Sequence, residues 1–484
     1  MNQLCYRLVF NRARGLLMAV AETTRSHGAS GSGLRLFAGV SFIGMLGWML
    51  LPAVAGAQIL PDRSAAPERQ PFVNTAPNGV PLVHIQTPNG AGVSRNAYSQ
   101  LDIQRDGAIL NNATQSVKTS LGGWVQANPL LNRPASVIVN EVNSSEPSLL
   151  RGPVEVAGQR AQVVIANPSG ISCDGCGFIN AYRATLTTGV PHYGPNGNLD
   201  SYLVRRGTVS IGGDGLDASS ADFTDVIARA VQVNAAMHTR DLTVISGRND
   251  ADSLQVTAVA GSEARPDFAM DVGALGGMYA RKIWLVGTEA GVGVRNAGTI
   301  GGGADEIRVT SAGRLEITGL VSSAGVLNVQ AAQGLSNRGT LHAAHNTFLQ
   351  VAGDLDNRGG LIASGGMLRI KDAAQGVRSL RIANTGGTLI SGGQALSVDA
   401  AGLTGDGKVL GTTDVDIRLT SDYDHTGELA ANRHLSLITT GTVNNHAALT
   451  AGQSLYIMAD KINNETDGAF VAQGCDCTVR HRTR

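Results

Sequence analysis

Beyond about residue 290, hydrophobic and polar residues alternate in short runs that are separated by corners rich in glycine and asparagine. Such runs cover residues 306–309, 326–329, 348–351 and 455–458. Alternation with a period of two is typical of β-strands that bury one face. The pattern therefore predicts strands of four or five residues, each with one face turned toward a core.

The corners between these runs repeat as Asn-x-Gly turns. They begin at Asn296, Asn337, Asn357 and Asn384. Gaps between corners are close to 20 residues from 337 to 357 and from 425 to 445, and others are near 27 or 41. A repeat of about 20 residues with short strands predicts a right-handed parallel β-helix. Asparagine tolerates the left-handed conformation, and stacked asparagine side chains can bond one another along a solenoid. We therefore interpret these asparagines as structural.

The alternative all-β architecture is an array of β-sandwiches, which would need antiparallel hairpins. Two-residue hairpin turns are sparse here, so the β-helix is favoured. The composition agrees, with 62 glycines and only 4% aromatic residues. We predict a less regular module over residues 58–303, with short β elements outside the helix, and regular repeats over residues 304–474.

Residues 1–57 have the pattern of an export signal. Five arginines precede residues 36–51, a stretch that carries no charge. Ala55 and Ala57 then provide small residues for cleavage before Gln58, which predicts use of the Sec machinery and signal peptidase. The alternative is an uncleaved anchor. No later apolar run approaches the length of a membrane-spanning helix, so we expect a soluble mature chain.

Charge argues against nucleic acid as a partner. The whole chain carries 38 basic and 38 acidic residues, and residues 1–57 hold five arginines and one glutamate. The mature chain would thus have 33 basic and 37 acidic residues, a net charge of about −4.

Two tight turns stand out in the module that follows the signal. Asn167-Pro168-Ser169-Gly170 lies between apolar strand residues, and Ile171 resumes the strand. Proline presets one dihedral angle, glycine supplies positive φ, and asparagine caps the turn. A second Asn-Pro pair, Asn128-Pro129, precedes Leu130.

These motifs resemble a known family. The start of the chain, with Tyr6-Arg7 and residues 10–12, resembles the extended signal region of very large bacterial secreted proteins. The turns resemble the secretion domain of the filamentous haemagglutinin and haemolysin exoproteins of two-partner secretion. The family's motif Asn-Pro-Asn-Gly-Ile has asparagine at its third position, where this chain has Ser169. The family's second motif, Asn-Pro-Asn-Leu, also has asparagine at its third position, where this chain has Leu130. The resemblance covers residues 1 to about 300.

The resemblance implies a secreted or surface-exposed exoprotein of an envelope with an outer membrane. Its domain would be recognised by the periplasmic domains of a dedicated outer-membrane β-barrel transporter. The recognition or secretion residues that carry over are Asn128, Pro129, Leu130, Asn167, Pro168, Ser169, Gly170 and Ile171. Their other interpretation is that they form turns which the domain needs in order to fold.

Four cysteines remain beyond the signal. Cys173-x-x-Cys176 is compatible with a redox motif, half a zinc site or a disulfide, and an oxidising periplasm favours the disulfide. We expect it to pin a surface loop beside Asn167. His342 and His345 would lie on opposite faces of a strand, which disfavours a metal. No catalytic motif is present, so we expect no enzyme activity and no cofactor.

Three functions remain open at this stage. The first is an adhesin of the haemagglutinin kind, which would contact glycans or receptors on host or neighbouring cells. The second is the amino-terminal part of a contact-dependent growth-inhibition toxin, and the third, more remote, is a β-helix enzyme that acts on polysaccharides. The basic tail, residues 475–484, breaks the alternating pattern and suggests a truncated or frameshifted end, or else a genuinely short product.

Overall fold

The computed structural model describes residues 6–11, 16–21, 58–252, 255–262, 264–374, 378–473 and 476–481. The chain divides into two units, Met1–Ala55 and Gly56–Arg484. The described part of the first unit is an antiparallel pair, β1 (Tyr6–Asn11) and β2 (Leu16–Ala21). The apolar run 36–51 and the predicted cleavage residues Ala55 and Ala57 lie outside the described residues, whereas Gln58 is exposed. Within the described ranges, no helix has the length and apolar character needed to cross a membrane.

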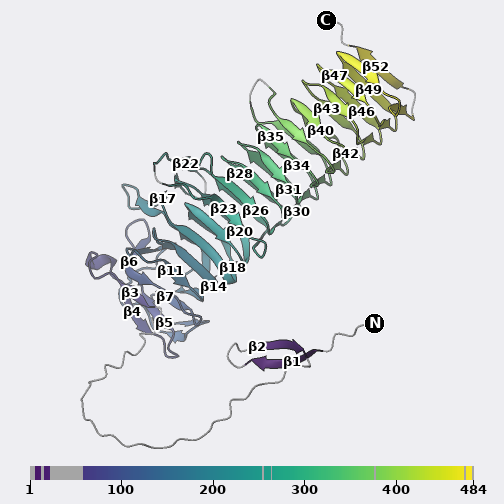
Figure 1. The fold of residues 1–484 in the computed structure, drawn as a ribbon. Coiled ribbons are helices and arrows are strands. Elements are labelled where there is room, and N and C mark those ends of the chain that lie inside the picture. Colours follow the sequence, from purple (N-terminus) through teal and green to yellow (C-terminus); the bar gives the residue numbers. More distant parts are fainter. Residues whose placement is uncertain are drawn as a thin grey trace, which may run out of the picture. The chain divides into compact units, whose positions relative to one another are not determined.

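The second unit is a parallel β-solenoid of about 16 turns (Figure 1). Strands of successive turns pair in parallel and build three sheets, which we call the first, second and third faces. Parallel pairing confirms the predicted β-helix and excludes the sandwich array. The first face consists of β6 (Val93–Leu101), β10 (Val137–Val142), β13 (Ala161–Ala166), β15 (Ala181–Thr187), β18 (Thr208–Ala228), β20 (Ala236–Ser246), β25 (Lys282–Gly287), β28 (Glu306–Ser311), β31 (Val326–Ala331), β34 (Thr347–Val351), β37 (Leu368–Asp372), β40 (Leu396–Asp399), β43 (Val415–Arg418), β46 (His434–Ile438), β49 (Ser454–Ala459) and β52 (Asp476–His481).

The second face repeats the same stacking one corner further along the chain. Its strands are β11 (Ser148–Leu150), β14 (Ile171–Ile179), the start of β18, β19 (Ala230–Val233), β23 (Phe268–Val272), β26 (Gly293–Asn296), β29 (Leu315–Ile317), β32 (Leu335–Asn337), β35 (Asp354–Asp356), β38 (Arg381–Ala383) and β41 (Gly402–Thr404), with β44 (Tyr423–His425), β47 (Thr442–Asn445) and β50 (Lys461–Asn464) as a separate ladder.

The third face completes each turn. It consists of β5 (Pro81–His84), β7 (Ala108–Asn112), β12 (Pro153–Gly158), parts of β14, β18 and β20, β24 (Gly277–Ala280), β27 (Thr299–Gly302), β30 (Leu320–Ser323), β33 (Thr340–Ala343), β36 (Leu361–Ser364), β39 (Thr388–Ser391), β42 (Lys408–Gly411), β45 (Glu428–Ala431), β48 (Ala448–Ala451) and β51 (Ala469–Ala472).

Inward-facing residues of the three faces form one continuous core, as the alternation predicts. Val329, Leu349 and Ile370 are successive register partners inside the first face, and each is at most 1% exposed. Full burial of such a side chain stabilises the fold by about 2 kcal/mol. Because each turn packs on its neighbours, stability is distributed along the solenoid rather than concentrated in one centre.

The Asn-x-Gly corners form the predicted asparagine ladder. The side-chain amide of Asn337 donates to Oδ1 of Asn357 at 2.7 Å, and that of Asn357 donates to Oδ1 of Asn384 at 2.8 Å. Farther along, a histidine takes the corresponding place, where Nε2 of His425 bonds the carbonyl oxygen of Ala448 at 3.2 Å. The ladder therefore pairs the buried side-chain amides from one turn to the next, and at its start Oδ1 of Asn337 has no hydrogen-bond partner among the described residues.

The amino-terminal module contains the predicted elements outside the helix. β16 (Val190–Tyr193), β17 (Leu199–Val204), β21 (Asn249–Ala251) and β22 (Val256–Ala258) form an antiparallel sheet. A hairpin joins β8 (Val117–Thr119) to β9 (Gly123–Val125). At the start of the unit lie β3 (Ile59–Pro61), the 3-10 turn η1 (Pro67–Arg69) and β4 (Phe72–Thr75).

The tail differs from the expectation that it breaks the strand pattern. β52 pairs in parallel with β49, so the backbone of residues 476–481 continues the first face. Backbone hydrogen bonds to the preceding turn form whatever the side chains are, which the alternation pattern alone does not register.

Candidate functional site

Asn167 closes the tight turn between β13 and β14. Its Oδ1 accepts a hydrogen bond from the backbone N–H of Ser169 at 2.9 Å, and its carbonyl oxygen accepts one from Gly170 at 3.0 Å. Its side-chain N–H₂ donates to the carbonyl oxygen of Glu146 at 3.0 Å and to Oγ of Ser148 at 3.1 Å. Asn167 therefore fastens its own turn to the segment around β11, the preceding strand of the second face, and it is 0% exposed.

The other residues of this turn support the same geometry. Gly170 has a φ of +123°, and a Cβ there would lie 3.1 Å from the carbonyl oxygen of Thr208. Oγ of Ser169 donates to the carbonyl oxygen of Ser144 at 2.8 Å. The serine that departs from the family pattern thus makes its own bond to the preceding coil, and Ile171 begins the buried strand that follows.

Asn128 repeats this arrangement on a different coil. Its Oδ1 accepts from the N–H of Leu130 at 2.9 Å, and its N–H₂ donates to the carbonyl oxygens of Ile85 and Asn111, both at 2.9 Å. Asn128 is buried, whereas Pro129 and Leu130 are exposed. Among the hydrogen bonds of the described residues, none joins this turn to the Asn167 turn. The motif residues therefore form two separate turns rather than one site. We call each a strap, because its asparagine side chain bonds the turn to other parts of the solenoid.

Burial limits what these asparagines can do in the folded protein. Both side-chain amides are bonded inside the molecule, so a partner could reach them only before the coils have folded. Pro129, Leu130 and the half-buried Pro168 and Ser169 remain accessible. The geometry gives the asparagines a structural role, and recognition by a transporter stays a prediction.

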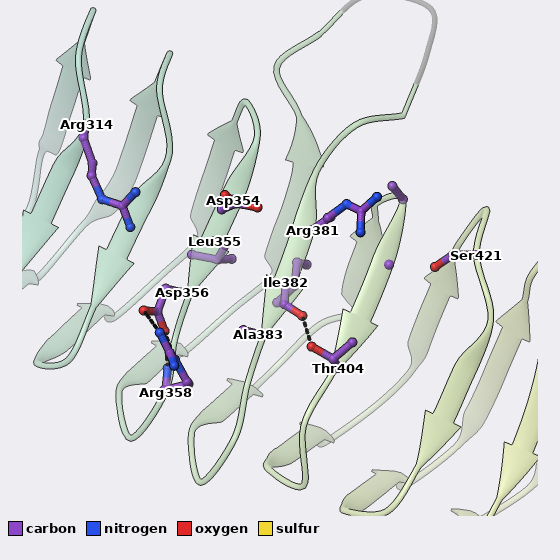
Figure 2. A pocket seen from close by; sticks show the side chains of 12 residues that line it. Arg314, Asp354, Leu355, Asp356, Arg358, Arg381, Ile382, Ala383, Thr404 and Ser421 are labelled. Carbon is purple, nitrogen blue, oxygen red and sulfur yellow. Dashed lines mark hydrogen bonds and ion pairs between the residues drawn. The ribbon is translucent and has the colours of Figure 1, made fainter. Parts of the chain in front are cut away.

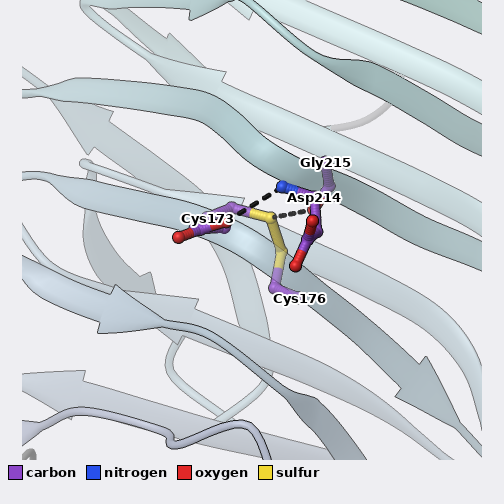
Figure 3. Close-up of a disulfide and its surroundings, with 5 residues drawn as sticks. Cys173, Cys176, Asp214 and Gly215 are labelled. Carbon is purple, nitrogen blue, oxygen red and sulfur yellow. Dashed lines mark hydrogen bonds between the residues drawn. A yellow bond between two sulfur atoms is a disulfide. The ribbon is translucent and has the colours of Figure 1, made fainter. Parts of the chain in front are cut away.

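Cys173 and Cys176 are joined by a disulfide inside β14 (Figure 3). The expectation of a surface loop is wrong: both cysteines are buried, and the register of β14 against β18 shifts between Asp174 and Cys176. This bulge brings the two Cα atoms to 5.3 Å. Asp174 accepts a hydrogen bond from the N–H of Asp214 at 2.9 Å, which ties the bulge to β18.

A charged cluster that sequence reasoning missed holds the start of the unit together. The Glu141 carboxylate bonds Arg69 at 2.6 Å, Arg95 at 3.0 Å and the hydroxyl of Tyr193 at 2.6 Å. The Arg95 guanidinium lies 3.9 Å from the centre of the Tyr193 ring. Burial, followed by the Glu141 charge, raises the pKa of Tyr193. The cluster links η1, β6, β10 and β16, whose residues lie far apart in the sequence.

A cavity of about 370 Å³ lies on the second face, across β35, β38 and β41 (Figure 2). The hydrogen bond from Arg358 lowers the pKa of Asp356 to about 2. Arg314 and Arg381 also line this cavity, and neither has an ion pair or hydrogen bond with any other described side chain. The described residues contain no group of three or more histidine, cysteine or carboxylate side chains arranged to hold a metal.

Comparison with known proteins identifies two family matches. Residues 57–317 match the model of the TPS secretion domain, and residues 1–48 match the Extended Signal Peptide of Type V secretion system. In structure, the chain is similar to the filamentous hemagglutinin secretion domain, with 29% identity and a TM-score of 0.50. That match covers 70% of this chain and 99% of the other.

Curated relatives in sequence are named as toxins and nucleases. The chain is 49% identical over 362 residues to Toxin CdiA of Yersinia pestis, which covers 72% of this chain and 11% of the relative. It is 41% identical to tRNA nuclease CdiA-2 of Burkholderia pseudomallei, over 67% of this chain and 11% of the relative. It is 37% identical to 16S rRNA endonuclease CdiA of Enterobacter cloacae, over 87% of this chain and 14% of the relative. The chain thus spans about a tenth of the length of these relatives.

Proposed function

Because the chain belongs to the two-partner secretion exoproteins, we propose that it is the amino-terminal part of a contact-dependent growth-inhibition toxin. Its extended signal peptide directs it to the Sec machinery, and its TPS secretion domain is the part that an outer-membrane partner transporter recognises. The protein is therefore exported to the cell surface or beyond it. Within the proposal, this stretch serves export and display, and it carries no catalysis.

The observation that carries the proposal is the 49% identity to Toxin CdiA over 72% of the chain. Identity to the filamentous hemagglutinin secretion domain is lower, at 29% over a similar share of the chain. The toxin function is accordingly favoured over an adhesin of the haemagglutinin kind. The polysaccharide enzyme has no support from either comparison.

The geometry suggests how this stretch contributes to export. Each strand pairs with the strand one turn later, so a coil can fold on the coil before it without waiting for any later part of the chain. Each coil buries its apolar face once it has left the transporter, and this burial favours outward movement. Asn128 and Asn167 would fasten the first coils, which serve as the template for the rest.

Secretion tests the export role. The full chain is produced with and without its partner transporter, alongside Asn167→Ala and the control Asn337→Ala. Asn337 is also 0% exposed and also bonds a neighbouring coil through its amide, but it lies beyond residues 57–317. We expect the partner to be required, and only Asn167→Ala to remain in the periplasm. Equal secretion of the two variants would contradict a special role for the first coils.

Competition between cells tests the toxin assignment. Cells that carry the complete locus are mixed with target cells on a solid surface, and an in-frame deletion of residues 58–303 serves as the comparison. We expect target growth to fall only when cells touch and only when these residues are present. If the deletion abolished attachment but left inhibition intact, the adhesin assignment would replace the toxin assignment.

A further inference from the structure

The first face carries an outward row of side chains that the export role does not use. Each member is the register partner of the next, from one strand to the following one. The row, in order along the solenoid, is Thr243, Trp284, Arg308, Asn328, Phe348 and Arg369. With one strand every ~4.8 Å, it extends over roughly 24 Å.

Two hollows open along this row. The first, of about 290 Å³, is bounded by Phe223, Trp284, Lys282 and Glu306, among others. The second, of about 280 Å³, begins on the next strand and is bounded by Phe348 and its neighbours on β31 and β37. Because Arg308 borders the first hollow and its register partner Asn328 the second, the two follow each other directly along one face. We call the row and its two hollows the first-face groove.

Aromatic rings are spaced along the groove. The Phe223 side chain is 41% exposed, and Trp284 and Phe348 are half-buried. Trp284 and Phe348 are separated by two strands, so their rings lie roughly 14 Å apart along the axis. Flat apolar rings on an otherwise polar surface can pack against the C–H faces of sugar rings, which are apolar in the same way.

Cations without partners lie beside these rings. Lys282, Arg369 and Lys371 form no ion pair or hydrogen bond with any other described side chain. Arg308, in contrast, is paired with Glu306 at 3.0 Å. The mature sequence is negative overall, so these three free cations make the groove locally positive. A guanidinium or ammonium group without a partner binds carboxylates strongly.

We propose that the first-face groove binds an acidic oligosaccharide that lies across the strands. Trp284 and Phe348 stack on sugar rings, while Arg369 and Lys371 bind carboxylates of the ligand. Amides along the second hollow bond sugar hydroxyls; they belong to Asn328, Gln330 and Gln350.

The acidic residues of the groove favour a glycan over a single-stranded nucleic acid. Asp241 and Glu306 line the first hollow. Each is paired with an arginine, Asp241 with Arg281 at 2.8 Å and Glu306 with Arg308 at 3.0 Å, and its oxygens still accept hydrogen bonds from sugar hydroxyls. A single-stranded DNA would also stack on the rings, but its backbone offers no hydroxyl donors to these oxygens.

The test is binding of an oligogalacturonate long enough to span the whole row to the purified full chain. Trp284 reports binding by its fluorescence, since Trp124 is the only other tryptophan beyond residue 57. We expect the double variant Arg369→Ala/Lys371→Ala to raise the Kd about tenfold, since it removes two charged hydrogen-bonding groups. A neutral dextran of equal length should bind about tenfold more weakly than the uronate, because it offers no carboxylates to these cations.

The matched control is Arg314→Ala/Arg381→Ala, which removes two free arginines from the cavity on the second face (Figure 2). It changes the net charge by the same amount and should leave the Kd unchanged. The proposal is overturned if both double variants weaken binding equally, if oligothymidylate binds more tightly than the uronate, or if no uronate binding is detected. Phe348→Ala provides a second check, because loss of the ring alone should also weaken binding.

Discussion

Replacement of Asn167 by alanine tests the claim that the secretion turn is a strap between coils. The change removes three hydrogen bonds, to Glu146, Ser148 and Ser169, with lengths between 2.9 and 3.1 Å. Each such bond contributes about 1 kcal/mol net, so the local free energy of unfolding should fall by about 3 kcal/mol. The backbone can keep its conformation, because Pro168 and Gly170 are unchanged.

The loss should be local, because stability in a solenoid is a sum over neighbouring turns. We therefore measure hydrogen exchange on the full chain and follow the amides of β14 and of β11, which Asn167 joins. A fall of about 3 kcal/mol corresponds to roughly a hundredfold faster exchange for amides that open with this coil. Strands β43 to β49 should exchange at the rate of the unchanged protein.

The control Asn337→Ala should move the effect to its own corner. It removes the bonds from the Asn337 amide to Asn357 at 2.7 Å and to Leu361 at 3.1 Å, so faster exchange should appear around β32 and β35. The strap interpretation is refuted if Asn167→Ala accelerates exchange in β14 less than about threefold. It is also refuted if the two variants give the same pattern along the chain.

Three further predictions concern other parts of the solenoid. Burial lowers the pKa of His425, so on acidification the unfolded state takes up a proton before the folded state does. The free energy of unfolding around this corner should therefore fall as the pH drops below about 6.5. His425→Asn should remove that pH dependence, which hydrogen-exchange measurements at pH 5 and 7 would show. Glu141→Gln removes the buried charge that pairs with Arg69 and Arg95, and it should lower the free energy of unfolding by about 2 kcal/mol. Trypsin should then cleave faster near the start of the unit, and an unchanged rate of cleavage would mean that the cluster contributes little to stability. Cys173 and Cys176 should react with a thiol reagent only after reduction and unfolding, and their double replacement by alanine should cost about 2 kcal/mol.

The asparagine ladder was predictable because its cause is local. A corner residue that repeats about every 20 positions must stack on its copy in the next turn once the chain forms a solenoid. The bond from Asn337 to Asn357 follows from that spacing alone, whereas the 27 positions between Asn357 and Asn384 include one longer turn. The same reasoning explains why the fold class could be predicted from the alternation of the strands.

The Glu141 cluster and the first-face groove were not predictable for the opposite reason. Glu141 meets Arg69 and Tyr193 across separations of 72 and 52 residues, and no sequence pattern marks the pairs. The groove depends on which residues share a register after turns of unequal length. β21 and β22 of the additional sheet interrupt the repeat, so Trp284 pairs with Thr243, 41 positions earlier. Only the three-dimensional register shows that both belong to one row.

Buried asparagines whose side-chain amides bond a neighbouring coil occur both within residues 57–317 and beyond them. Asn167 and Asn337 therefore differ mainly in their position along the solenoid. Asn167 and Asn337 are equally buried, and each fastens its coil through a side-chain amide. A later coil folds on an edge that many completed turns support, whereas the coil at Asn167 folds on only the first few strands, β10 and β11 among them. A weakened strap at Asn167 removes the template for everything that follows, while a weakened strap at Asn337 leaves a template of several turns intact. Export should therefore be most sensitive to substitutions in the first coils, even where the bonds that are lost are the same.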